Sequence, residues 1–259
     1  MPRSRTYETE ALVLKRSKLG EADRIITLYT PERGKVRAVA RGVRRAKSKM
    51  AGHLELITHS HLTLAQGRNL DIIAGGQTIE SFVALKNDLQ LGSYALYAAE
   101  LVDQFSMENE TGTVFFNLLR DFWHHLQPGN DNDLNLFYFE IQLLQSAGYR
   151  PQLAGCTLCH RELSPVPNAF SAASGGVLCP ACAAAQPYSR SISVNALKVL
   201  RFLQGQDADT VRRLRLTTEL RGELDTLLRG YLRYLLEKDL KSASWLDELR
   251  SPASVSPGP

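Results

Sequence analysis

Hydrophobic and polar positions alternate along the first 80 residues in short segments that are separated by turn-forming residues. Five such segments, rich in Ile, Val, Leu and Thr, predict strands at 10–15, 24–29, 35–41, 54–64 and 70–79. Pro31 and Gly34 favour a compact hairpin between the second and third strands, and Gly75-Gly76 indicates a bulge in the last. Five short antiparallel strands in so few residues predict a small closed barrel of the OB type, although an SH3-like barrel fits nearly as well.

From Phe82 onward the apolar period becomes helical. Aromatic and aliphatic stripes at this spacing are typical of a buried core rather than of a cofactor pocket. Ser193 is placed to cap one helix, and Thr217 or Thr218 to cap a longer one that ends near Lys238. The pattern therefore predicts an all-helical region after the barrel.

These patterns predict an α+β multidomain protein. We expect a nucleic-acid-binding OB-like barrel at 1–80 and a helical domain at 81–250, with a four-cysteine module inserted at 150–190. The tail at 251–259 is mostly Ser and Pro and is expected to be disordered.

The chain has 259 residues, of which 44% are apolar, so it can bury a substantial core. No apolar run approaches the roughly 20 residues that span a bilayer, and no apolar segment follows the basic N-terminus. We therefore expect a cytoplasmic protein without a membrane partner, and one that is nucleoid-associated if its polyanion is DNA. Residues 1–80 hold 15 Lys and Arg against 8 Asp and Glu, a net charge of +7, which leaves −3 for the remainder. This asymmetry indicates that the N-terminal part meets a polyanion.

Four cysteines form two Cys-x-x-Cys pairs with nineteen residues between them. This spacing is typical of a zinc ribbon, in which four thiolates complete a tetrahedron around one Zn²⁺ and leave no open position for catalysis. Two disulfides or unrelated buried thiols are the alternatives, and an intracellular setting disfavours disulfides. We expect His160 to lie beside the ligands or in solvent. The predicted ligands of this structural ion are Cys156, Cys159, Cys179 and Cys182.

The densest charge in the chain is a stretch of eight cations without an acidic residue. Its members, the predicted DNA-binding residues, are Arg33, Lys35, Arg37, Arg41, Arg44, Arg45, Lys47 and Lys49. Strand alternation sends Lys35, Arg37 and Arg41 outward, and 42–50 is expected to be a flexible basic loop. No Phe, Tyr or Trp occurs between Thr30 and Ser81, so we expect salt-sensitive, sequence-tolerant binding dominated by phosphates. An ordinary solvated surface is the alternative interpretation.

Motifs of common enzymes are missing from the sequence. Gly34-Lys35 lacks the rest of a phosphate-binding loop, and no Gly-x-Ser-x-Gly, His-Glu-x-x-His or Gly-x-Gly-x-x-Gly motif occurs. A barrel with a four-cysteine zinc module also occurs in NAD-dependent DNA ligases, but their Lys-x-Asp-Gly nucleophile motif is absent. We expect a binding protein rather than an enzyme.

Three segments near the N-terminus are similar to the beginning of the RecO family: Glu10 to Lys15, Leu19 to Thr30 and Gly34 to Arg45. Gly148-Tyr149-Arg150-Pro151 precedes the first cysteine pair as the family's linker does. The resemblance extends from about Thr6 to about Trp245. It implies a recombination mediator that binds single- and double-stranded DNA and anneals complementary strands without ATP.

The resemblance further implies two partners, RecR and the single-stranded DNA-binding protein, and through them the loading of RecA. It assigns DNA contacts to Lys35, Arg37, Arg41, Arg44 and Arg45. The zinc tetrad occurs in only part of the family, which implies a stabilising role. Two other functions share these features: an RNA- or ribosome-associated zinc-ribbon protein, and a scaffold that binds only proteins.

Overall fold

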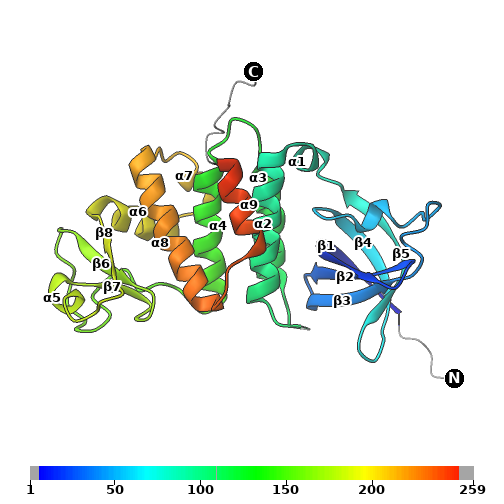
Figure 1. Ribbon diagram of the computed structural model, residues 1–259, viewed down its shortest axis with the longest axis horizontal. Coiled ribbons are helices and arrows are strands. Elements are labelled where there is room, and N and C mark those ends of the chain that lie inside the picture. The colour runs from blue at the N-terminus through cyan, green and yellow to red at the C-terminus, as the bar shows by residue number, and fades with distance from the viewer. Residues whose placement is uncertain (1–5, 109, 251–259) are drawn as a thin grey trace, which may run out of the picture. The chain divides into compact units, whose positions relative to one another are not determined.

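The computed structural model describes residues 6–108 and 110–250 of the chain. Five strands close into a barrel in the order β1-β2-β3-β5-β4 (Figure 1). Alternate positions point inward because successive side chains of a strand face opposite ways, so that Val36, Ala38 and Ala40 of β3 enter the barrel core. The tail 251–259, for which disorder was expected, lies outside the described residues. The strands are β1 (Thr6–Leu19), β2 (Asp23–Thr30), β3 (Gly34–Ala40), β4 (His59–Ala65) and β5 (Asp71–Glu80).

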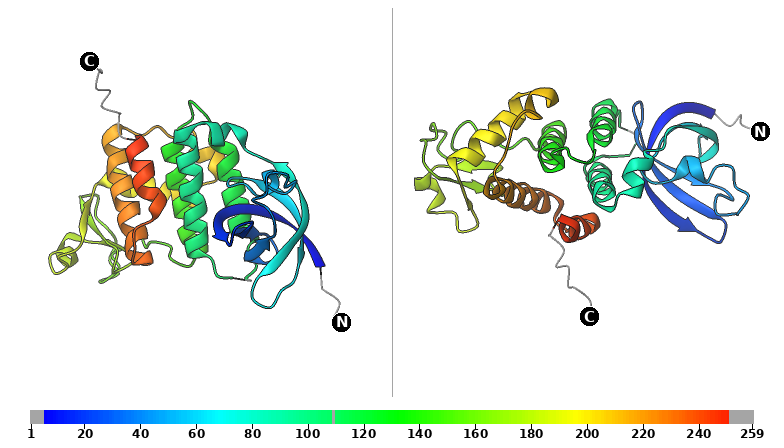
Figure 2. Two further views of the ribbon diagram at one scale, coloured as in Figure 1. Left: turned by 45° about the vertical axis from the view of Figure 1, so that its right-hand side comes forward. Right: turned by 90° about the horizontal axis from the view of Figure 1, so that it is seen from above.

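β1 is the longest strand and serves two neighbours. Its first half pairs with β4, from Thr6 opposite Ala65 onward, and its second half pairs with β2 up to Leu19 opposite Asp23. The pairing with β2 shifts register between Val13 and Lys15, and such an irregularity bends a strand. Figure 2 shows the bent β1 (dark blue) wrapping around the barrel. This bend closes five strands into a barrel without a free edge.

The expectation that all strands run antiparallel is wrong for one pair, because β3 and β5 are parallel. The fourth strand also begins later than expected, at His59. A 3-10 turn, η1 (Gly52–Leu54), occupies the chain before it and places Leu54 in the barrel core. The expected bulge in β5 is present: the register against β4 skips Ala74, next to Gly75.

Three helices follow the barrel, and the last helix of the chain returns to them. They are α1 (Val83–Asn87), α2 (Leu89–Phe105), α3 (Thr113–His125) and α9 (Lys241–Arg250). α3 covers the outer face of β2, where the ring of Tyr29 packs 6.2 Å from that of Phe115 and is 3% exposed. Glu100 on α2 accepts hydrogen bonds from the backbone N–H groups that begin α9, at Lys241 and Ser242. These helices and the barrel form one compact unit, up to Pro128 and from Leu240 onward.

A second compact unit comprises Gly129–Asp239. The Ser193 hydroxyl accepts from the N–H of Ala196 and the Thr217 hydroxyl from that of Leu220, so both predicted caps are confirmed. The small sheet has the strand order β7-β6-β8 (Figure 1). The elements are α4 (Asn132–Ser146), β6 (Asn168–Ser171), β7 (Gly176–Leu178), α5 (Pro180–Ala183), β8 (Arg190–Ile192), α6 (Val194–Gly205), α7 (Ala208–Val211) and α8 (Thr218–Leu236).

The predicted fold class is confirmed: a closed five-stranded barrel precedes a helical region that contains a four-cysteine cluster. Throughout the described part of the chain, every helix is too short or too polar to cross a bilayer.

Candidate nucleic-acid surface and metal centre

The eight cations of the basic stretch separate into two groups. Arg33, Lys35 and Arg37 lie on β3 or just before it, with Lys35 and Arg37 on the outer face of the strand. The other five lie in or at the start of the loop that follows β3, residues 41–50, which we call the basic loop. The members of the second group are Arg41, Arg44, Arg45, Lys47 and Lys49.

The first group is engaged by other parts of the same unit. The ammonium of Lys35 donates to the backbone carbonyl of Asp103 at 2.6 Å and lies 3.5 Å from its carboxylate, and only 16% of the Lys35 side chain is exposed. Arg37 lies 3.9 Å from the carboxylate of Glu108, and the guanidinium of Arg33 stacks 3.8 Å from the ring centre of Tyr7. The stretch has no acidic residue in its sequence, yet the fold brings two carboxylates to it.

A polar cavity of about 190 Å³ lies beside the first group. The loop between β4 and β5, residues 66–69, forms one wall and adds Arg68, while Asp71 and Glu108 contribute negative charge. In OB folds, oligonucleotides bind to the face of the second and third strands and to the loop between the fourth and fifth strands. Arg68 was not predicted as a site residue because it stands alone in the sequence, after the turn-forming Gly67.

The basic loop, for which the sequence predicts flexibility, consists of successive turns. The N–H of Gly42 donates to the carboxylate of Asp23 at 2.7 Å, and Gly42 has a positive φ of 62°, which favours glycine. Arg44 donates from its backbone N–H to the Ala22 carbonyl and from its guanidinium to the Gly20 carbonyl. The loop is therefore fastened to the turn between β1 and β2.

The five cations of the basic loop all face solvent. Within the described residues, no ion pair joins them to an acidic side chain. Strand pairing adds two further cations at this end of the barrel: Lys18 lies opposite Arg24, and Arg24 lies opposite Ala40, the last residue of β3 before the loop. Sequence inspection missed both, because only the register of three strands brings them beside the loop. The result is an exposed cationic surface that suits a phosphate backbone.

The aromatic residues of the barrel are not available for stacking against bases. Tyr29 is buried, and Tyr7 lies between Arg33 and Asp71, whose carboxylate accepts its hydroxyl. His59 is buried and packs edge-on at 5.6 Å from the ring of Phe116. Burial lowers the pKa of His59, although its hydrogen bond with Glu10 acts in the opposite direction. The barrel surface therefore offers charge without exposed rings.

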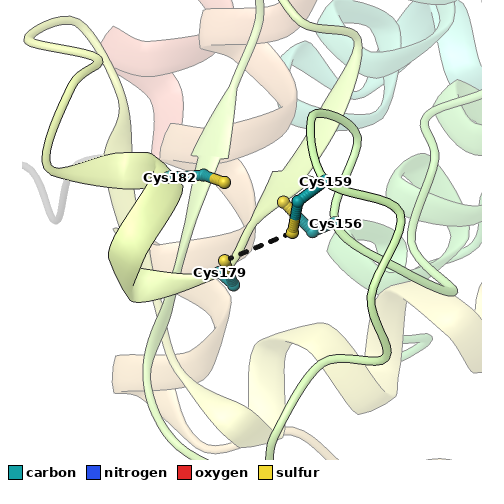
Figure 3. A group of neighbouring side chains, drawn as sticks. All are labelled: Cys156, Cys159, Cys179 and Cys182. Atoms are coloured by element: carbon teal, nitrogen blue, oxygen red, sulfur yellow. Dashed lines mark hydrogen bonds between the residues drawn. The ribbon is translucent and has the colours of Figure 1, made fainter.

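The four cysteines converge on one point (Figure 3). Their sulfur atoms all lie within 4.8 Å of one another, and the Sγ atoms of Cys159 and Cys179 are 3.8 Å apart. Sulfurs that bind one zinc ion tetrahedrally at about 2.3 Å are separated by about 3.8 Å, whereas disulfide sulfurs are about 2.05 Å apart. All four are free thiols. The arrangement fits a metal ion and excludes the two-disulfide alternative in this structure.

Local backbone structure points the thiols inward. The N–H of His160 donates to the Cys156 carbonyl, and the N–H of Ala183 to that of Cys179, so each pair lies on a tight turn. His160 is exposed and has a positive φ of 58°. Gly175 ends the β6–β7 turn, and Gly176 begins β7 at a close approach, where a Cβ would lie 2.3 Å from the Gln152 carbonyl oxygen.

The ionisation of the thiols reflects their crowding. Burial opposes ionisation of Cys156, but backbone hydrogen bonds from Cys159, Cys179 and Leu158 lower the pKa of its thiol to about 6. Hydrogen bonds with the other three thiols raise the pKa of Cys182 to about 12. Four thiolates repel one another at this distance, so a bound cation is what would allow them to ionise together.

Together, the closed barrel with its cationic surface and the four-thiol cluster define a class of OB-like barrel proteins that carry a four-cysteine module able to hold a metal ion. Two family descriptions match the chain: Recombination protein O N terminal over residues 3–82, and Recombination protein O C terminal over residues 86–244. The chain belongs to the RecO family.

Individual relatives agree over nearly the full length. A DNA repair protein RecO of Dehalococcoides mccartyi strain CBDB1 is 42% identical over 250 residues, which cover 96% of this chain and 98% of the relative. That of Roseiflexus sp. strain RS-1 is 43% identical over 98% of this chain and 91% of its own length. The DNA repair protein RecO of Symbiobacterium thermophilum is 36% identical over 95% of this chain and 98% of its own length.

Proposed function

We propose that this protein acts in DNA repair as a recombination mediator that binds DNA through the basic loop. The single observation that carries the proposal is the set of five exposed cations on residues 41–50, fastened to the β1–β2 turn and unpaired with acids of the described residues. Such cations bind DNA by displacing counterions from the phosphates and need no particular base sequence. Similarity to proteins named DNA repair protein RecO supports the same role.

The same surface suits strand annealing without ATP. Two complementary strands repel each other, and exposed cations lower this repulsion while leaving the bases free to pair. The rings of Tyr7 and Tyr29 are occupied within the fold, so the barrel does not hold bases by stacking. We assign the annealing step to the basic loop, with no catalytic residue and no bond made or broken.

The proposed ion in the four-thiol cluster is Zn²⁺, bound by Cys156, Cys159, Cys179 and Cys182. Four thiolates fill its coordination sphere, so its contribution is to stabilise the module around it. The proposed partners are RecR and the single-stranded DNA-binding protein, and the outcome is loading of RecA onto coated strands. These partners come from membership of the family.

The decisive experiment measures annealing of two complementary oligonucleotides coated with the cognate single-stranded DNA-binding protein, without nucleotide. The wild-type protein is compared with an Arg44→Glu/Arg45→Glu variant at two salt concentrations. We expect acceleration that fades with salt and disappears in the variant. The salt dependence of single-strand binding should become shallower by about 1.4 in log–log slope, since each lost phosphate contact removes about 0.7.

A matched control reverses two exposed charges of the second compact unit, Arg161→Glu/Arg213→Glu. This control should anneal like the wild type. Equal loss in both double variants would show a general charge effect and remove the basic loop from the proposal. If the metal-loaded wild-type protein does not accelerate annealing, the proposal fails, and RNA competition then tests the RNA-associated alternative.

A further inference from the structure

An open groove runs between the metal-binding module and the C-terminal end of α8, both within the second compact unit. It encloses about 890 Å³. Tyr188 and Arg190 line one side, and Arg233, Tyr234 and Lys238 line the other. A second cavity of about 420 Å³, between Arg190 and the preceding turns of α8, lies next to it. Neither the basic loop nor the four thiols contribute a residue to this groove.

Tyr188 is presented in an unusual way. Its side chain is 95% exposed, although a ring of this size normally buries most of its surface. It occupies the third position of a turn in which the Ser189 N–H donates to the Gln186 carbonyl, and Pro187 before it restricts the backbone. The Gln186 N–H in turn donates to Ala183 at the end of α5. The ring is therefore held out to solvent by a turn anchored on the helix that carries the metal ligand Cys182.

The opposite wall carries a second ring, since Tyr234 on α8 is 52% exposed. α8 is fixed against the module by Phe170 on β6, whose ring packs edge-on at 5.4 Å against that of Tyr231. The hydroxyl of Tyr231, which also lies on α8, donates to the backbone carbonyl of Tyr149. The two exposed rings therefore belong to elements that are packed together, and the groove is a built feature of the unit.

The charges of the groove favour an anion. Asp239 is paired with Arg233 at 3.0 Å, which leaves Arg190 and Lys238 against the single carboxylate of Glu237. Arg190 is exposed on β8 at the side of Tyr188. Two rings flanked by cations form the combination that holds single-stranded nucleic acids, in which bases stack on rings and phosphates meet the cations.

We propose that this groove is a second nucleic-acid site that takes unpaired bases of single-stranded DNA, stacking them on Tyr188 and Tyr234. The inference rests on the proposed DNA-binding function and divides the work between two surfaces. The basic loop binds phosphates of any strand, and the groove binds bases that are not paired. Because duplex bases are stacked on one another, the groove distinguishes single strands from duplexes, which the barrel surface does not.

The test uses the full-length, metal-loaded protein and three labelled probes followed by fluorescence anisotropy: an oligothymidylate, a backbone of equal length without bases, and a duplex. A Tyr188→Ala/Tyr234→Ala variant should bind the oligothymidylate at least about tenfold more weakly, because it loses the stacking of bases on both rings. Its affinity for the base-free backbone and the duplex should stay within about twofold of wild type. Arg190→Glu should weaken binding of the oligothymidylate and the base-free backbone alike.

Tyr149→Ala is the matched control, because this ring is also exposed in the same unit but does not line the groove. It should bind all three probes like the wild type. Equal affinity of wild type and the double tyrosine variant for the oligothymidylate would overturn the inference and leave the groove to a protein partner. The inference would also be overturned if the double tyrosine variant lost as much affinity for the base-free backbone as for the oligothymidylate. A wild type that binds no probe would instead refute the proposed function itself.

Discussion

Removal of the metal tests how the second unit is held together. The cluster around the thiols buries Cys156, Ala169 and Leu178, and it buries Leu163, Ala183 and the other three ligands only in part. Burial of a leucine contributes about 2–3 kcal/mol and of an alanine less. A structural zinc ion contributes about 10–16 kcal/mol in small zinc-dependent folds. The ion therefore outweighs the apolar cluster that surrounds it, and we expect the module to unfold locally without the ion.

The assay is hydrogen exchange followed by mass spectrometry, with and without a chelator, and with a Cys182→Ser variant. Peptides from 150–190 should lose protection when the metal is removed, while peptides from β1–β5 should keep theirs, because the barrel has its own buried core. DNA binding through the basic loop should persist. Release of one zinc ion per chain, measured by elemental analysis, should accompany the loss.

Two results would refute this reasoning. Full protection of 150–190 after complete metal removal would show that side-chain packing, including Phe170 against Tyr231, holds the module without the ion. Loss of protection in the barrel as well would show that the ion stabilises the whole chain. A Cys182→Ser variant that retains a full equivalent of zinc would remove this thiol from the set of ligands.

Two further predictions concern the first unit. Lys35→Ala should change the salt slope of single-strand binding little, because Asp103 already holds the Lys35 ammonium, whereas Arg44→Ala should make the slope shallower by about 0.7. The free energy of unfolding should fall as the pH drops below about 6.5, and His59→Gln should reduce this fall. Burial lowers the pKa of folded His59, so the neutral form is favoured. The stability that neutral His59 contributes is therefore fully present above the pKa of histidine in the unfolded chain. It is lost as the pH falls through the lower pKa of His59 in the folded protein.

Both predictions have internal comparisons. Salt titrations of the two alanine variants use the same probe, and equal slopes for Lys35→Ala and Arg44→Ala would contradict the assignment of Lys35 to Asp103. Urea unfolding of wild type and His59→Gln at about pH 7.5 and about pH 5.5 isolates the histidine, because the metal thiolates titrate in both proteins. An identical pH dependence of the two proteins would contradict the role of His59.

Features that depend on neighbours in the chain followed from the sequence. The two Cys-x-x-Cys turns, the caps Ser193 and Thr217, and the inward alternation of β3 were all predicted and are present. Each rests on backbone geometry over a few residues, or on thiols whose chemistry permits few alternatives. Family membership also followed, because the quoted segments are local strings of residues.

Features that join distant segments were decided only by the tertiary structure. Three such features are the parallel pairing of β3 with β5, the neutralisation of Lys35 by Asp103, and the placement of Tyr188 and Tyr234 along one groove. A run of basic residues shows how much charge a segment carries, but not which acids the fold will bring to it. The exposure of a side chain is likewise decided by packing, so one tyrosine, Tyr29, is buried while another, Tyr188, is exposed to solvent.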